Sequence, residues 1–277
     1  MRKTKGRSGR PQGAVATSAK QMLPPVAAML SLCLVGCGDR VTANPDIIDP
    51  LEQHAYFPLE TGRWVAYRVD SVVYDFAPGG GTLRDSSTTF VRELVGDTVT
   101  DNTGAPAYLI ERYESPGPNG PWQFRYVETA TLNTQQAIRT EQNLRFLKLV
   151  FPMDRRTEWD GNLWIDADRE IAVAGERMRP FANWLYEVDT IDKPDVIGPF
   201  AFDSVLTITE VDQNNAIELR ISRAKYARGI GLVWREQWIL DSQYCNEDPT
   251  PADCLTLPWT DKAERGYVLK QVIIDHN

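Results

Sequence analysis

Two strand-like segments, residues 63–76 and 232–241, place a carboxylate and several aromatic side chains where they could act together. Side chains alternate between the two faces of a strand, so Glu236 shares a face with the tryptophans on either side of it. An unpaired glutamate is costly to bury between two indoles unless water or a ligand reaches it. We therefore expect an open, concave ligand-binding face. Its predicted residues are Trp64, Tyr74, Trp234, Glu236 and Trp238.

Carboxylates among aromatic side chains can also have raised pKa values, and a pair of them can hydrolyse a glycoside. A carbohydrate-active hydrolase that uses Asp and Glu alone is therefore one alternative function. The other alternative for such carboxylates is structural, as partners of arginine or as residues at a sheet edge.

Residues 160–170 gather oxygen-bearing side chains at alternating positions. Ca²⁺ takes six to eight oxygen ligands, and a calcium site is one interpretation of this cluster. The segment lacks the glycine and the distal glutamate of an EF-hand, so an ordinary solvated acidic loop is the other. The candidate ligands are Asp160, Asn162, Asp166, Asp168 and Glu170. No other cofactor is expected.

The chain has four cysteines. Cys245 and Cys254 enclose a proline-containing segment, and we expect them to form a disulfide in an exported protein. Such a bond would add roughly 2 to 3 kcal/mol to the free energy of unfolding. A metal site would need further Cys or His residues nearby, and a redox pair would need C-x-x-C spacing.

Histidine chemistry is excluded for the most part, because the chain has only His54 and His276, one near each end of the expected domain. A Ser-His-Asp triad or a His-based zinc site is therefore not expected. The sequence also lacks H-E-x-x-H, G-x-S-x-G, G-x-G-x-x-G and phosphate-binding glycine loops. These absences favour a non-catalytic protein.

The elements that must hold these residues are predicted to be short strands separated by turn signals such as Gly79-Gly80-Gly81. The pattern predicts a mainly β fold, an antiparallel meander that forms a curved sheet, half-barrel or open barrel with at most short helices. Residues 171–178 are predicted as one or two helical turns. The predicted strands span 63–76, 87–95, 107–113, 122–129, 136–140, 144–151, 185–191, 202–211, 217–222, 232–241 and 266–274.

The N-terminal segment has a basic leader followed by an apolar stretch at 22–35, which is too short for a membrane-spanning helix and typical of a secretory signal. The stretch ends in Leu34-Val35-Gly36-Cys37, which resembles the lipobox of bacterial lipoproteins. That resemblance implies cleavage before Cys37 and a diacylglycerol on its sulfur, so that the membrane is a partner through the lipid. The expected organisation is a signal peptide at 1–36, a lipidated tether at 37–54 and one β-rich domain at 55–277.

Removal of residues 1–36 leaves 24 Lys and Arg against 38 Asp and Glu, a formal charge of −14. Such a chain repels phosphate backbones, so nucleic acid is not an expected partner. Gly38 follows the lipobox cysteine, and Asp39 comes one position after the place where aspartate would retain an enterobacterial lipoprotein in the inner membrane. We therefore expect attachment to the outer membrane.

Three further segments, Phe57-Pro58-Leu59-Glu60, Phe151-Pro152-Met153-Asp154 and 229–236, resemble uncharacterised β-rich envelope lipoproteins of Bacteroidota-like bacteria. That group implies no activity. The preferred function is a non-catalytic, lipid-anchored envelope protein whose curved sheet binds an apolar or mixed ligand or an envelope protein partner. The alternatives are the hydrolase described above and a structural or adhesion lipoprotein.

Overall fold

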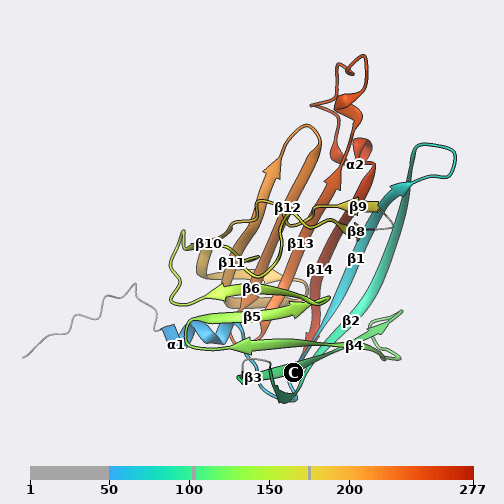
Figure 1. Ribbon diagram of the computed structural model, residues 1–277. Coiled ribbons are helices and arrows are strands. Elements are labelled where there is room, and N and C mark those ends of the chain that lie inside the picture. The colour runs from blue at the N-terminus through green and yellow to red at the C-terminus, as the bar shows by residue number, and fades with distance from the viewer. Residues whose placement is uncertain (1–49, 102–103, 174–175) are drawn as a thin grey trace, which may run out of the picture. The chain divides into compact units, whose positions relative to one another are not determined.

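Alternating apolar and polar side chains generate a strongly curved antiparallel sheet, as the sequence predicts. The structure, a computed structural model, describes residues 50–277 except 102–103 and 174–175 (Figure 1). The signal segment, Cys37 and most of the expected tether lie outside the described residues. Within the described residues, no helix is long and apolar enough to cross a membrane. The predicted mainly β fold class is confirmed.

Twelve strands of the described part of the chain form one sheet in the order β6-β5-β4-β3-β2-β1-β14-β13-β12-β11-β10-β7. Every neighbouring pair is antiparallel. The bounds of its strands are β1 Trp64–Phe76, β2 Thr82–Thr100, β3 Pro106–Ser115, β4 Gln123–Leu132, β5 Gln136–Glu141, β6 Leu144–Val150, β7 Glu158–Trp159, β10 Tyr186–Ile197, β11 Phe200–Asn214, β12 Glu218–Ala227, β13 Gly231–Asp241 and β14 Arg265–His276.

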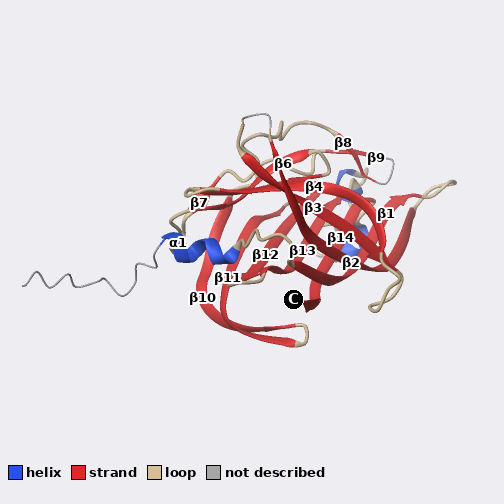
Figure 2. Cartoon of the chain, turned by 90° about the horizontal axis from the view of Figure 1, so that it is seen from below, coloured by secondary structure: helices blue, strands red, loops and turns tan. Residues whose placement is uncertain are grey.

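The sheet consists of two meanders joined at its middle. β1 to β6 pair in chain order, as do β10 to β14, and the first strand pairs with the last from Val65 opposite His276 to Tyr74 opposite Gly266. The sheet wraps around an interior (Figure 2), and its two edges meet. The backbone N–H of Leu147 donates to the Gly161 carbonyl at 2.8 Å, and the Trp159 Nε1–H donates to the Leu147 carbonyl at 2.9 Å. The result is a nearly closed barrel.

The helix predicted at 171–178 is wrong. These residues form a separate hairpin of two short strands, β8 Ile171–Val173 and β9 Glu176–Met178, with Ile171 opposite Met178. The β-branched residues Ile171 and Val173 favour an extended backbone, and the hairpin packs across β14 on the inner side of the sheet.

A short N-terminal segment packs against the barrel. It comprises the helix α1 at Pro50–Gln53 and a 3₁₀ turn at His54–Tyr56. The buried Gln53 amide exchanges two 2.7 Å hydrogen bonds with the backbone of Met153. The side chain of Tyr56 is fully buried, and its hydroxyl lies 2.8 Å from that of Ser204. Residues 50–54, expected at the end of the tether, are thus built into the domain.

Candidate functional site

The interior of the barrel holds a cavity of about 450 Å³. Side chains on alternate positions of successive strands line it: Val69, Ser71 and Val73 of β1, Arg139 and Glu141 of β5, Phe146 and Lys148 of β6, Arg235 and Gln237 of β13, and Tyr267, Leu269 and Gln271 of β14. The spacing of two places each set on the inner face of its strand. This cavity is the candidate ligand site.

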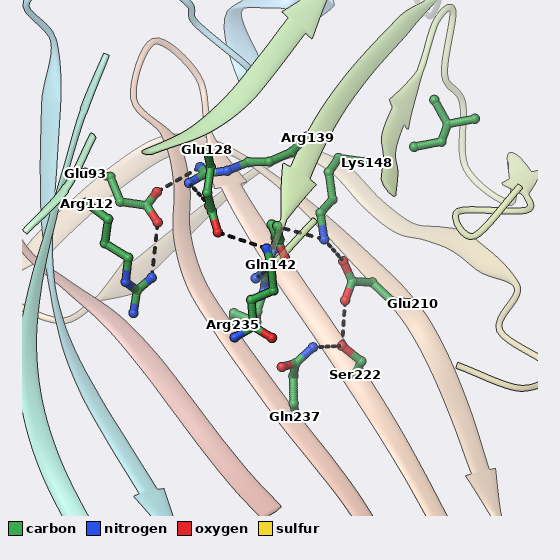
Figure 3. Close-up of polar contacts among 12 residues, drawn as sticks. Glu93, Arg112, Glu128, Arg139, Gln142, Lys148, Glu210, Ser222, Arg235 and Gln237 are labelled. Carbon is green, nitrogen blue, oxygen red and sulfur yellow. Dashed lines mark hydrogen bonds and ion pairs between the residues drawn. The ribbon is translucent and has the colours of Figure 1, made fainter. Parts of the chain in front are cut away.

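One side of the cavity contains a chain of ion pairs contributed by four strands (Figure 3). Glu93 of β2 accepts a 2.8 Å hydrogen bond from Arg139 and a 3.5 Å bond from Arg112 of β3. Arg139 also donates to Glu128 of β4 at 3.0 Å. The second oxygen of Glu128 accepts the backbone N–H of Gln142 at 3.3 Å. Each charge therefore has an opposite charge as partner.

The network continues across the interior of the barrel. Arg235 of β13 donates through both terminal nitrogens to Glu141 of β5, at 3.2 and 3.3 Å. The ammonium group of Lys148 lies 3.4 Å from Glu141 and 3.7 Å from Glu210 of β11. Glu210 in turn accepts a 2.5 Å hydrogen bond from Ser222. These side chains join strands that are far apart in the sequence.

Burial and charge together set the protonation of this network. Burial disfavours an ionised Glu141, but the cationic Arg235, Lys148 and Arg139 outweigh it and hold its pKa well below the usual 4.5. For Glu128, burial dominates and raises the pKa. Burial, followed by the charge of Arg235, lowers the pKa of Lys148. Burial also raises the pKa of the Tyr267 hydroxyl to about 12, so this tyrosine stays neutral.

The remaining wall of the cavity is largely apolar. Ile171 and Val173 of the β8–β9 hairpin, Phe181 and Trp184 of the following segment, and Leu232 of β13 all line it. Trp184 is almost fully buried, and its Nε1–H donates to the Pro180 carbonyl at 2.8 Å. The cavity thus combines an apolar wall with charged groups, as sites for small organic ligands do.

The structure places Trp234, Glu236 and Trp238 on the outer face of β13. They alternate with Arg235 and Gln237, which line the cavity. Glu236 stands opposite Arg223 of β12 and Lys270 of β14 in the strand register. The expectation that these three residues lie on the concave face is therefore wrong.

The other two predicted ligand-binding residues are also outside the cavity. Trp64 lies 4.5 Å, ring centroid to guanidinium carbon, from Arg92, which stacks on Trp122 at 4.4 Å. Tyr74 is buried, and Trp238 packs against the same apolar cluster. The structure brings Tyr74 and Trp238 together but does not assemble the five residues into one site.

The candidate calcium ligands do not converge. Glu170 faces Arg177 at 4.0 Å and Arg179 at 3.9 Å. Asp160 and Asp166 accept backbone N–H groups within their own turns, at 2.9 Å from Asn162 and 3.2 Å from Asp168. Among the residues described, no group of three or more His, Cys, Asp or Glu side chains could hold a metal ion.

Cys245 and Cys254 are free thiols in this structure and lie within hydrogen-bonding contact. That contact, together with burial, raises the pKa of the Cys254 thiol. The two cysteines are therefore adjacent, as a disulfide requires, and the bond itself stays a prediction.

The charged interior is not among the sites predicted from the sequence, although the residues that form it are spaced by two. Arg139 and Glu141 are two residues apart, as are Phe146 and Lys148 and also Arg235 and Gln237. Such spacing shows that the two residues of each pair lie on the same face of a strand. It does not show whether that face points into the barrel or toward solvent.

No protein-family model and no curated protein matches this chain. Two solved structures are similar to it. One is described as a "putative lipoprotein" from Parabacteroides distasonis, with a TM-score of 0.37, and the other as a "putative exported protein with YmcC-like fold" from Bacteroides fragilis, with a TM-score of 0.40. Each is 10% identical, and each alignment covers 80% of this chain and 98% of the other. At these TM-scores neither likeness carries an argument about function.

Proposed function

We propose that this chain is a lipid-anchored protein of the cell envelope that binds an amphipathic small molecule inside its barrel. The observation that carries the proposal is the cavity of about 450 Å³, which has an apolar wall on one side and a buried charged network on the other. A ligand with an apolar body and a polar end matches both surfaces. The lipobox at Cys37 supports attachment to a membrane, with the outer membrane as the expected one.

The charged network argues against hydrolysis by paired carboxylates. A glycosidase needs one carboxylic acid that gives up its proton and a second carboxylate that is free to attack or to activate water. Here Glu93 and Glu141 have lowered pKa values, and arginines hold them ionised. Because both oxygens of each group accept hydrogen bonds, neither is free for catalysis. We therefore place binding ahead of the hydrolase alternative.

Adjacent positions on β14 allow a matched test. Leu269 lines the cavity, whereas Lys270 lines a shallow groove on the outer face. Leu269→Trp should fill part of the cavity, and Lys270→Trp should leave it open. The measurement is the saturable fluorescence of the neutral apolar dye N-phenyl-1-naphthylamine. We expect binding by the wild type and by Lys270→Trp, with at least a tenfold loss in Leu269→Trp, equivalent to about 1.4 kcal/mol.

A wild-type protein that gives no saturable signal would contradict the proposal. So would a Leu269→Trp protein that is folded and binds the dye as the wild type does, because binding would then occur elsewhere. Far-ultraviolet circular dichroism of both variants shows whether the sheet is retained.

A further inference from the structure

We infer that the ligand of this cavity presents an anionic head group, a carboxylate or a phosphate on an apolar chain, to Arg139 and Arg235. The inference rests on the proposed cavity-binding function and adds the chemistry of the ligand's polar end. It follows from the unequal use of hydrogen-bond donors and acceptors in the charged network.

All the carboxylate oxygens of the network are already engaged. Glu93 accepts from Arg112 and Arg139, and Glu128 accepts from Arg139 and the Gln142 backbone. Both oxygens of Glu141 accept from Arg235. Of the two oxygens of Glu210, one faces Lys148 at 3.7 Å and the other accepts from Ser222. A ligand that donates hydrogen bonds would therefore have to displace an existing partner.

The donors, in contrast, are in excess. A guanidinium group carries five N–H bonds. Arg235 directs its two terminal nitrogens to Glu141, and Arg139 directs its own to Glu93 and Glu128. The Nε–H of each arginine is buried and has no hydrogen-bond partner among the described residues, so an acceptor in the cavity reaches it when the side chain turns. Both side chains line the cavity. The group that would complete this site is thus an acceptor, and anionic acceptors form the strongest bonds to guanidinium.

The charge balance of the network permits an added anion. Its four cationic side chains, Arg112, Arg139, Lys148 and Arg235, face four carboxylates, Glu93, Glu128, Glu141 and Glu210. Arg112 also lies 3.7 Å from Glu114, whose charge is balanced by Arg125 at 2.9 Å. Burial raises the pKa of Glu128, so this carboxylate accepts a proton more readily than Glu93 or Glu141, whose pKa values are lowered, when a second anion approaches Arg139. Arg139 can then turn from Glu128 to the ligand without leaving an uncompensated charge.

The apolar end of the ligand also has a defined place. Phe146 and Leu232 line the cavity next to Lys148 and Arg235, and Leu269 and Ile171 extend the apolar wall. A chain that starts at the arginines therefore lies against aliphatic and aromatic side chains and leaves its charge at the network.

The test compares four probes that share one chain length and differ in the head group: decanoate, decyl phosphate, decanol and decylammonium. Full-length protein in phosphatidylcholine vesicles at pH 8 is titrated with each, protein-free vesicles are subtracted, and the change in tryptophan emission is followed. We expect decanoate, decyl phosphate or both to bind about tenfold or more tightly than decanol, and decylammonium to bind weakest. The two anions distinguish a carboxylate from a phosphate head.

The failures can be told apart. If decanol or decylammonium binds as tightly as both anions, the head-group inference is overturned and the cavity-binding function stands. If none of the four probes binds, both are overturned.

Variants locate the site. Arg235→Gln and Arg139→Gln should each reduce the preference for an anion over decanol by about tenfold. The control is Arg223→Gln, because Arg223 lies on the exposed side of neighbouring β12 and pairs with Asp212 at 2.6 Å. It should leave the preference unchanged. An unchanged preference in both cavity variants would overturn the assignment to these arginines, and the probe series on the wild type remains decisive if either variant fails to fold.

Discussion

Gly161 lies directly against the ring of Tyr186, so closely that a Cβ at position 161 would overlap the ring. The ring cannot move away, because Tyr186 is fully buried between Trp159 and Trp184, at centroid distances of 5.6 and 6.2 Å. The Gly161 carbonyl also accepts the Leu147 N–H that joins the two edges of the sheet. A residue without a side chain is therefore required where the barrel closes.

Gly161→Ala should lower the free energy of unfolding by about 1 to 3 kcal/mol through overpacking. Urea denaturation followed by tryptophan fluorescence measures the change. Gly117→Ala is the control, because a Cβ there meets no atom within 4 Å. We expect a change of at most about 0.5 kcal/mol from it. Equal stability of the two variants would show that the contact with Tyr186 is not restrictive.

Glu141→Gln tests the buried ion pairs. Removing one partner of a buried pair leaves the other charge uncompensated, so we expect a loss of about 3 kcal/mol at pH 7. The pKa of Glu141 is lower in the folded protein than the usual 4.5. Its contribution to stability is therefore complete above that value and is lost as the pH falls below it.

The urea midpoint of the wild type should accordingly fall between about pH 5 and pH 3, and that of Glu141→Gln should fall less. Glu236→Gln, on the outer face, controls for the removal of one negative charge. Parallel pH profiles for the wild type and Glu141→Gln would refute the assigned role of this carboxylate.

Cys245 and Cys254 should be disulfide-bonded in the exported protein, and reduction should lower the melting temperature by several degrees. Thiol titration under denaturing, non-reducing conditions measures the bond. Cys245→Ser provides the reference for a protein with a single thiol at this place. Two reactive thiols in the exported wild type would end this prediction.

Cys37→Ser should abolish lipid attachment and leave the precursor uncleaved, because a serine hydroxyl cannot replace the thiol in lipid transfer. Labelling with radioactive palmitate and the mobility of the protein on a gel measure both effects. Cys33→Ser, in the same apolar stretch, should be labelled normally. Label that persists in the Cys37→Ser protein would place the anchor elsewhere.

The sequence predicts the strands well, because their alternation is a local property. The predicted segments 63–76 and 232–241 correspond to β1 at Trp64–Phe76 and β13 at Gly231–Asp241. The orientation of β13 could not be predicted in the same way, because each of its faces combines apolar and polar side chains. Trp238 packs outside the barrel against a cluster that includes Ala263 and Trp259 from the segment around the helix α2, Trp259–Lys262.

The charged interior escaped prediction for a different reason. The charged side chain of Arg235 can be buried on the inner face of β13 only because it pairs with Glu141. The two residues are 94 positions apart in the chain, so the sequence does not show this pairing. Alternation shows which side chains of a strand share a face. Only the closed sheet shows that the inner faces of β5 and β13 lie opposite each other.

The pairing of β1 with β14 has a consequence for how the protein is made. Each meander consists of contacts between neighbours in the chain, whereas the seam between them joins Val65 to His276. Bringing such distant segments together is the slow part of assembly for a β protein. The sheet therefore cannot be completed until β14 has been synthesised, and a chain that stops before β14 would carry two half-sheets, each with an exposed edge that is prone to aggregation.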